Sequence, residues 1–164
     1  MLVSPESMPE NTRIWIYQAN RKFSDIEISE INVLTKKFLE SWTAHANELK
    51  SSFEMVHSIF LILMIDENHA AASGCSIDKS IHLIRDIEKK FGVSLLDRQA
   101  YAYYDKDDVK VVPVKEFERL IENGFIDSDT IVFDNLITKK SELKSRWKIP
   151  IGLSWHKNLF NLVK

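Results

Sequence analysis

Glycine is scarce in this sequence. The 164 residues contain only four glycines, Gly74, Gly92, Gly124 and Gly152, and no two of them share a loop. A phosphate-binding P-loop needs two glycines and a lysine close together, and a dinucleotide-binding fingerprint needs three glycines. Neither pattern can be assembled here. The sequence therefore excludes a standard nucleotide-binding loop, and we expect no cofactor.

Cysteine is scarcer still, because Cys75 is the only one. A single cysteine can form neither an internal disulfide nor a multi-cysteine zinc site. The five histidines are widely spaced and include no paired-histidine helix motif. Asp66, Asp78 and Asp97 would suit a divalent cation if the fold brought them together, but solvated surface carboxylates are the more common case. We therefore predict no metal site.

Neither sign of charge is in excess. There are 22 Lys and Arg against 24 Asp and Glu, which gives a net charge of −2. This balance does not favour nucleic acid or anionic lipid, and we interpret the short basic stretch of residues 139–148 as a solvated helix flank. The longest apolar run, residues 59–65, is too short to cross a bilayer, and residues 1–6 lack the features of a signal peptide. We expect a soluble cytoplasmic protein without a nucleic-acid or membrane partner.

The first half alternates β-prone segments with amphipathic helices. Bulky β-branched and aromatic runs predict strands, and apolar residues at helical spacing predict helices. Ser24 and Glu27 form a capping box at the start of the first helix. The predicted elements are a strand at 13–18, a helix at 25–42, strand residues 53–65 divided into a hairpin at 57–58, and a helix at 76–91 ended by Gly92. This order predicts a β-α-β-β-α unit in residues 1–97.

The second half begins with the clearest hairpin pattern in the chain. Aromatic and β-branched segments flank a turn of charged residues, and a short helix and a further strand follow. The predicted elements are strands at 101–104 and 109–112, a helix at 114–123 closed by Gly124, and a strand at 131–133. We expect a β-β-α-β unit over 98–148 and a mostly helical tail over 149–164, packed on the core through Trp155 and Phe160. The predicted class is α+β.

Residues 98–148 carry a recognisable order of elements: an aromatic hairpin, a proline, a helix, a glycine, an isoleucine, Asp-Thr, a strand and a tryptophan. The segments are Ala102-Tyr103-Tyr104, Val112-Pro113-Val114, Glu116-Phe117, Leu120-Ile121, Gly124, Ile126, Asp129-Thr130, Val132-Phe133 and Trp147. This order resembles a bacterial GYF-type domain. Val112 stands where that family usually has glycine, and the Gly-Tyr-Phe element itself is absent.

The GYF resemblance implies a surface of aromatic rings that binds proline-rich peptides in an extended conformation. The alternative is that the same rings are simply core, which is the more common fate of aromatic side chains. The candidate peptide-binding residues are Tyr101, Tyr103, Tyr104, Phe133 and Trp147.

Three further segments resemble a family of small bacterial proteins often labelled "ABC transporter ATPase". They are residues 42–46 (Trp-Thr-Ala-His-Ala), residues 73–78 (Ser-Gly-Cys-Ser-Ile-Asp) and residues 155–157 (Trp-His-Lys), and the likeness spans almost the whole chain. Ala46 stands where members typically have glycine. The glycine pattern does not support the ATPase label, so the resemblance implies no activity.

Cys75 is the best candidate for chemistry. At helical spacing, Cys75, Asp78 and His82 share one face, and the free amides and dipole at a helix start stabilise a thiolate. His82 or His45 would then act as a base, oriented by a carboxylate. The alternative is a small buried hydrophobic cysteine beside ordinary helix-capping residues.

These patterns leave three hypotheses. The first is a binding or adaptor protein that recognises a peptide or partner protein through the aromatic face of residues 98–148. The second is a cysteine-dependent enzyme that acts on a small amide, ester or thioester through Cys75. The third is a structural subunit whose partner covers exposed apolar surface. The shortage of catalytic motifs favours the first, and the sequence predicts no oligomeric state.

Overall fold

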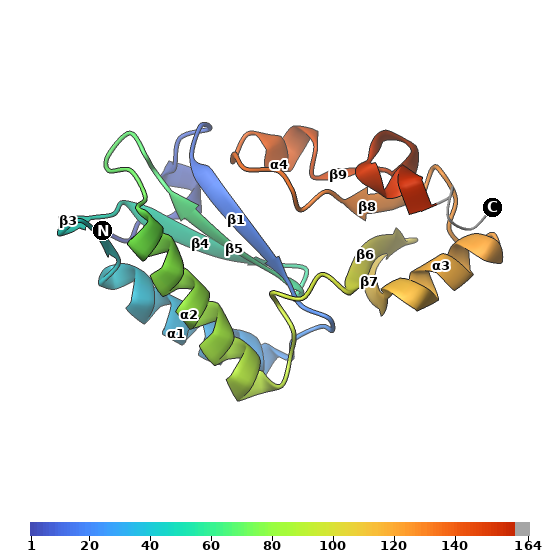
Figure 1. The fold of residues 1–164 in the computed structure, drawn as a ribbon, viewed down its shortest axis with the longest axis horizontal. Helices are drawn as coiled ribbons and strands as arrows, with labels where there is room; N and C mark the ends of the chain where they lie inside the picture. Colours follow the sequence, from blue (N-terminus) through green and yellow to red (C-terminus); the bar gives the residue numbers. More distant parts are fainter. Residues whose placement is uncertain (160–164) are drawn as a thin grey trace.

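Two antiparallel sheets pack face to face between helices, which gives an α+β fold of four layers (Figure 1). In this computed structural model, residues 1–159 are described. The first sheet has the strand order β1 (Arg13–Gln18), β5 (Phe60–Ile65), β4 (Ser51–Val56), and the second has the order β7 (Asp108–Pro113), β6 (Ala100–Asp105), β8 (Ile131–Phe133), β9 (Lys148–Pro150). The predicted α+β class is confirmed.

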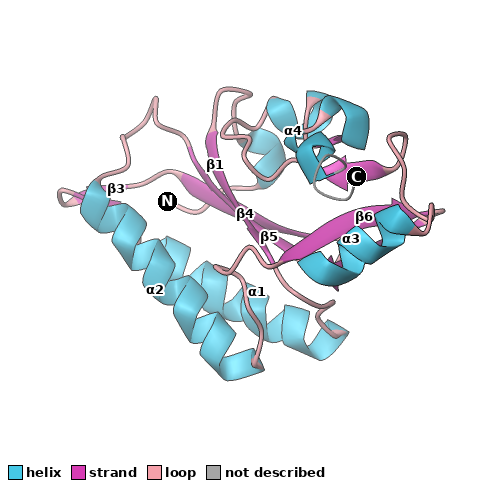
Figure 2. Ribbon diagram, turned by 45° about the vertical axis from the view of Figure 1, so that its right-hand side comes forward, coloured by secondary structure: helices cyan, strands magenta, loops and turns pink. Residues whose placement is uncertain are grey.

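The two long helices lie together on one side of the first sheet, and a shorter helix packs on the second sheet (Figure 2). They are α1 (Asp25–Glu40), α2 (Gly74–Phe91) and α3 (Val114–Glu122). The smaller elements are the hairpin β2 (Thr43–Ala44) and β3 (Asn47–Glu48), the helix α4 (Glu142–Ser145), and the 3-10 turns η1 (Pro5–Ser7), η2 (Ile151–Leu153) and η3 (Trp155–Lys157).

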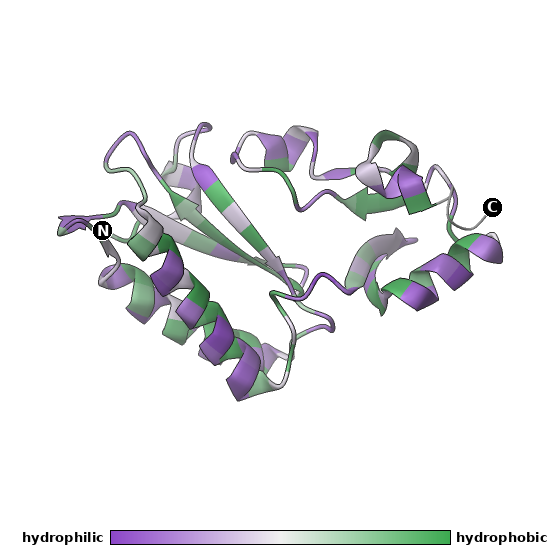
Figure 3. Cartoon of the chain, in the orientation of Figure 1, coloured by the Kyte–Doolittle hydropathy of each residue, from purple (hydrophilic) through white to green (hydrophobic). Residues whose placement is uncertain are grey.

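The central strand β5 is buried along its whole length, because both faces of the first sheet are covered. Leu61 and Leu63 pack with the α1 and α2 side chains, whereas Phe60 and Ile62 pack with the second sheet. This alternation follows from the two-residue period of a strand. Hydrophobic residues accordingly follow the strands and one side of each long helix, and hydrophilic residues lie on the outer sides of the helices (Figure 3).

Three aromatic rings join the two sheets. The ring centroid of Phe60 lies 4.7 Å from that of Phe133 and 5.0 Å from that of Trp147, and the latter two are 5.1 Å apart. All three belong to one buried cluster that contains residues from both halves of the chain. The predicted division between residues 1–97 and 98–148 lies in the connection from α2 to β6. The two halves thus share a hydrophobic core.

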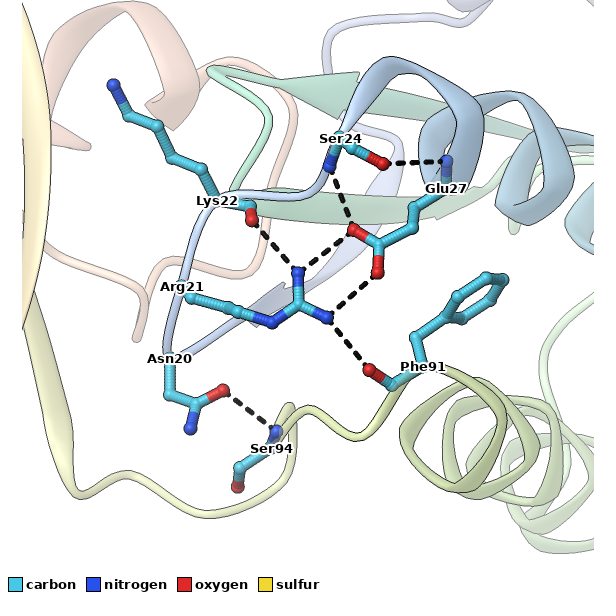
Figure 4. A network of polar contacts seen from close by, with 7 residues as sticks. All are labelled: Asn20, Arg21, Lys22, Ser24, Glu27, Phe91 and Ser94. Carbon is cyan, nitrogen blue, oxygen red and sulfur yellow. Dashed lines mark hydrogen bonds and ion pairs between the residues drawn. The ribbon is translucent and has the colours of Figure 1, made fainter.

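The start of α1 is held by the predicted capping box. Ser24 Oγ accepts the backbone N–H of Glu27 at 3.2 Å, and the Glu27 carboxylate accepts the backbone N–H of Ser24 at 2.8 Å. Arg21 binds both oxygens of that carboxylate at 2.8 and 2.9 Å and also donates to the carbonyl of Phe91 (Figure 4). The network therefore connects the start of α1 to the end of α2. Next to it, Asn20 accepts the backbone N–H of Ser94 at 3.0 Å.

Turn residues agree with the sequence at two positions. His57 and Ser58 have φ of 53° and 57° and form the turn between β4 and β5, at the predicted break. Gly92 ends α2 in the left-handed region, with φ of 62°.

The β2–β3 hairpin and β9 were not predicted. They have two or three residues each and, unlike the equally short β8, they contain no run of bulky β-prone residues. The predicted helix over 25–42 ends at Glu40, because Trp42 turns into the core and its indole N–H donates to the carbonyl of Ser76 at 2.8 Å. The tail forms two 3-10 turns through Lys157, and Phe160 lies outside the described residues.

Phe60→Ala is expected to lower the free energy of unfolding by about 3–5 kcal/mol, because it opens a cavity among fully buried rings. Denaturant unfolding followed by tryptophan fluorescence and by far-UV circular dichroism measures this. Val33→Ala is the control, since Val33 is exposed, and it should change stability by less than about 0.5 kcal/mol. A loss below about 1 kcal/mol for Phe60→Ala would contradict the shared core.

Glu27→Gln is expected to lower stability at neutral pH and to flatten the acid side of the pH–stability curve. The hydrogen bonds from Arg21 lower the pKa of Glu27 from 4.5 to about 2. The stabilisation is therefore complete above pH 4.5 and is lost as the pH falls toward 2, because the unfolded chain takes up the proton first. The two proteins should converge over that range in denaturant unfolding at a series of pH values. The control is Glu122→Gln, which removes an exposed carboxylate that forms no hydrogen bond with residues 1–159.

Parallel pH–stability curves for Glu27→Gln and the parent would show that the Glu27 carboxylate does not have the lowered pKa.

Candidate binding cleft

A cleft of about 280 Å³ lies where β1, the connection from α2 to β6, and the chain after β8 meet. Its apolar walls come from Ile16 in β1, Tyr101 in β6, Phe133 in β8 and Trp155 in η3. A second hollow of about 330 Å³ adjoins it along β1 and shares Ile16, Leu95, Arg98, Asn135 and Leu136 with the first. The two hollows are adjacent, and we call them together the β1 cleft.

A chain of three hydrogen bonds fixes two amide side chains in this cleft. Trp147 Nε1 donates to Asn135 Oδ1, Asn135 Nδ2 donates to Gln18 Oε1, and Gln18 Nε2 donates to the carbonyl of Ala100, each at 2.9 Å. The indole can only donate and the backbone carbonyl can only accept, so the orientation of both amides is determined. The amide nitrogens of Gln18 and Asn135 each keep a second N–H that none of residues 1–159 accepts.

His156 supplies a buried imidazole to the same cleft. The residue is 2% exposed, its ring stacks on Trp155 at 3.8 Å, and the edge of Tyr101 packs against it. Burial lowers the pKa of His156 to about 4, so the ring is neutral at physiological pH.

The hydrogen bond between Ser154 and His156 leaves the other ring nitrogen available. Ser154 Oγ accepts the backbone N–H of His156 at 3.4 Å and lies 2.6 Å from Nδ1. The hydroxyl either donates to Nδ1 or accepts from it, depending on the tautomer of the ring. Within residues 1–159, Nε2 has no hydrogen-bond partner, and it carries the proton in the tautomer in which Ser154 donates to Nδ1.

The five predicted peptide-binding aromatics do not form one exposed face, and that expectation is corrected. Tyr103, Phe133 and Trp147 are buried, at 8%, 2% and 3% exposure, and Tyr101 and Tyr104 are partly buried. The reason is that the second sheet packs one face on the first sheet and the other on α3. Tyr101 and Phe133 nevertheless line the β1 cleft.

The predicted catalytic residues lie outside the β1 cleft. Cys75, Asp78 and His82 are exposed on α2, and His45 is exposed in the β2–β3 turn. Among the described residues, no hydrogen bond joins their side chains, and none of the four lines the β1 cleft. Ala46, where the resembling family has glycine, has φ of 66°, a conformation that glycine adopts without strain.

The carboxylates considered for a cation are also separate. Asp66 is buried and pairs with Lys50 at 3.0 Å, whereas Asp78 and Asp97 are exposed. No group of three His, Cys, Asp or Glu side chains suited to a metal ion occurs within residues 1–159. None of the helices in that range combines the length and apolar character needed to cross a membrane.

Sequence reasoning missed four polar residues of the cleft: Gln18, Arg98, Asn135 and His156. They come from β1, the α2–β6 connection, the chain after β8, and η3. No local motif joins them, because each lies in a different part of the chain. The only sequence signal was the Trp155-His156 pair, which contributed to a family resemblance but not to a site prediction.

No family model, curated protein or solved structure matches this chain. The GYF-type resemblance and the wider family resemblance therefore stay predictions.

The imidazole of His156 is expected to titrate with a midpoint near 4 in an NMR pH titration of the folded protein. Its folded-state pKa lies below the ordinary value of 6.5, so the unfolded chain binds the proton first and stability falls as the pH drops from 6.5 toward 4. The full effect is of the order of 3 kcal/mol. A midpoint close to 6.5 would show that His156 is solvated and would remove it from the cleft.

Proposed function

We propose that this protein is a binding or adaptor protein that recognises a peptide segment of a partner protein in the β1 cleft. The observation that carries the proposal is the combination of aromatic walls with fixed polar side chains in one groove. Ligand sites in proteins typically pair apolar lining with a few oriented polar groups. The apolar lining of the groove comes from Tyr101, Phe133 and Trp155. Its polar groups come from Gln18, Asn135 and His156.

Exposed apolar side chains at the rim support a macromolecular ligand. Leu136 is 54% exposed and lines both hollows of the cleft, and Trp155 is partly exposed beside them. Aromatic anchors surrounded by a polar rim are typical of protein-binding surfaces. Tyr101 and Phe133 belong to the GYF-like segment of residues 98–148. The proposed site therefore includes two of the five predicted peptide-binding residues and lies where that segment meets β1.

The cysteine-dependent alternative has less support. The exposed thiol of Cys75 is its one favourable feature, because Asp78 and His82 neither hydrogen-bond to it nor share a cleft with it within the described residues. A nucleophile needs a base within hydrogen-bond reach. We therefore retain the binding function as the proposal.

A random heptapeptide display library, panned on the immobilised full chain, should yield peptides with saturable binding in fluorescence anisotropy. Leu136→Glu is expected to weaken such a peptide at least about tenfold, because it places a charge in the apolar wall of the cleft. The matched control is Phe125→Glu, at an exposed phenylalanine outside the cleft, and its affinity should stay within about twofold of the parent. Failure to select any saturable binder, or equal affinity for the parent and Leu136→Glu, would count against the proposed function.

A further inference from the structure

The outer edge of β1 is open over its second half. The backbone N–H of Ile14 points away from β5 and donates to the carbonyl of Thr138 at 2.9 Å, whereas that of Ala19 points toward β5 and donates to Ile59 at 2.8 Å. Backbone groups of successive strand residues point to opposite edges. The N–H and C=O groups of Ile16 and Gln18 therefore point outward, and within residues 1–159 no backbone group pairs with them on that side.

The opposite edge of the same sheet is paired at the start of β4. There the N-terminal segment lies beside Ser51: Val3 N–H donates to the carbonyl of Ser51 at 3.0 Å, and Ser51 N–H donates to the carbonyl of Met1 at 2.9 Å. An edge with unpaired N–H and C=O groups accepts an added strand from another chain. Since Ile16 and Gln18 also line the β1 cleft, the open part of the edge faces the groove.

Hydrogen-bond donors are in excess in this groove. Gln18 and Asn135 each have a spare amide N–H, and the His156 ring offers an Nε2–H in the tautomer in which Ser154 donates to Nδ1. Arg98 lines both hollows, is exposed, and forms no ion pair with residues 1–159. Asp97 is the one acidic side chain of the lining. Donors without acceptors fit a ligand that is rich in oxygen lone pairs and negatively charged.

We propose that the β1 cleft binds the carboxyl-terminal end of an extended peptide. The main chain of the peptide pairs with β1 at Ile16, and its terminal carboxylate accepts hydrogen bonds from Gln18, Asn135 and His156. Arg98 supplies the opposite charge. This inference rests on the proposed function and names the ligand class of the same site.

The space available favours a chain end over a chain that runs through. The hollow that contains the donors has a volume of only about 280 Å³. Thr138 already occupies the edge of β1 at Ile14, so backbone pairing of the peptide is limited to Ile16 and Gln18, and the residues that precede its carboxyl terminus must leave the edge of β1 there. The adjoining hollow, which shares Ile16 and Arg98, gives the preceding residues of the peptide a path out of the groove.

The first test compares a selected heptapeptide as the free acid with the same peptide carrying a C-terminal amide. The probe is the strongest binder from a display library with free carboxyl termini, measured by fluorescence anisotropy on the full chain. We expect the amide to bind at least about tenfold more weakly, because it removes the charge and one oxygen. Equal affinity for acid and amide, with binding still lost in Leu136→Glu, would overturn this inference and leave the proposed function standing.

Charge variants test the assignment to Arg98. Arg98→Gln is expected to weaken the free acid about tenfold and the amide little. The matched control Arg85→Gln, at an exposed arginine of α2 outside the cleft, should change neither. Asp97→Asn should leave the affinity of the free acid unchanged or increase it, since it removes the like charge. Two results would contradict a carboxylate at this position. One is that Asp97→Asn binds the free acid more weakly than the parent does, and the other is that Arg98→Gln binds the free acid as tightly as the parent does.

Hydrogen exchange tests the strand addition separately. The backbone N–H of Ile16 has no partner within residues 1–159 and should exchange with solvent until the peptide binds, when its exchange should slow by at least about tenfold. The amide of Val3, which donates to Ser51 at the other edge of the sheet and lies outside the cleft, serves as the reference. Unchanged exchange at Ile16 in a saturated complex would overturn the pairing with β1. Absence of any peptide binding would instead reject the proposed function itself.

Discussion

The packing of Phe60 against Phe133 and Trp147 is the interaction on which the other features depend. It buries the inner face of both sheets in one aromatic cluster, and it thereby fixes β1 relative to β6 and β8. Close-packed interiors transmit such constraints because side chains have few alternative positions. The β1 cleft is a consequence, since it forms where the edge of the first sheet meets the second sheet and the chain after β8.

The hydrogen-bond chain from Trp147 to Ala100 makes this geometry specific. Apolar packing alone would tolerate small shifts between the sheets, but the path through Asn135 and Gln18 requires each donor to meet its acceptor. Buried polar groups without partners are costly, so the network favours a single arrangement. The amides in the cleft are consequently oriented before any ligand arrives, which reduces the entropic cost of binding.

The sequence predicted what depends on neighbouring residues. The strand over Arg13–Gln18, the capping box at Ser24 and the helix end at Gly92 are all local, and all agree with the structure. The β2–β3 hairpin and β9 contain no run of bulky β-prone residues, and they form because tertiary contacts hold them. Burial of Phe133 and Trp147 also depends on tertiary packing, because an aromatic-rich strand pattern does not reveal which sheet covers it.

The same difference between local and tertiary contacts explains why the sequence indicated a site at Cys75 and gave no indication of the β1 cleft. Cys75, Asp78 and His82 are close in sequence, so helical periodicity alone places them on one face, where they are exposed and no hydrogen bond joins them within the described residues. Gln18, Arg98, Asn135 and His156 are up to 138 positions apart (156 minus 18) and become neighbours only in the folded chain. Spacing along one helix reports local geometry, whereas a site that excludes water and orients several polar groups needs walls from several elements. The cleft meets that requirement and the helix face does not, which is why the binding function rests on the folded structure.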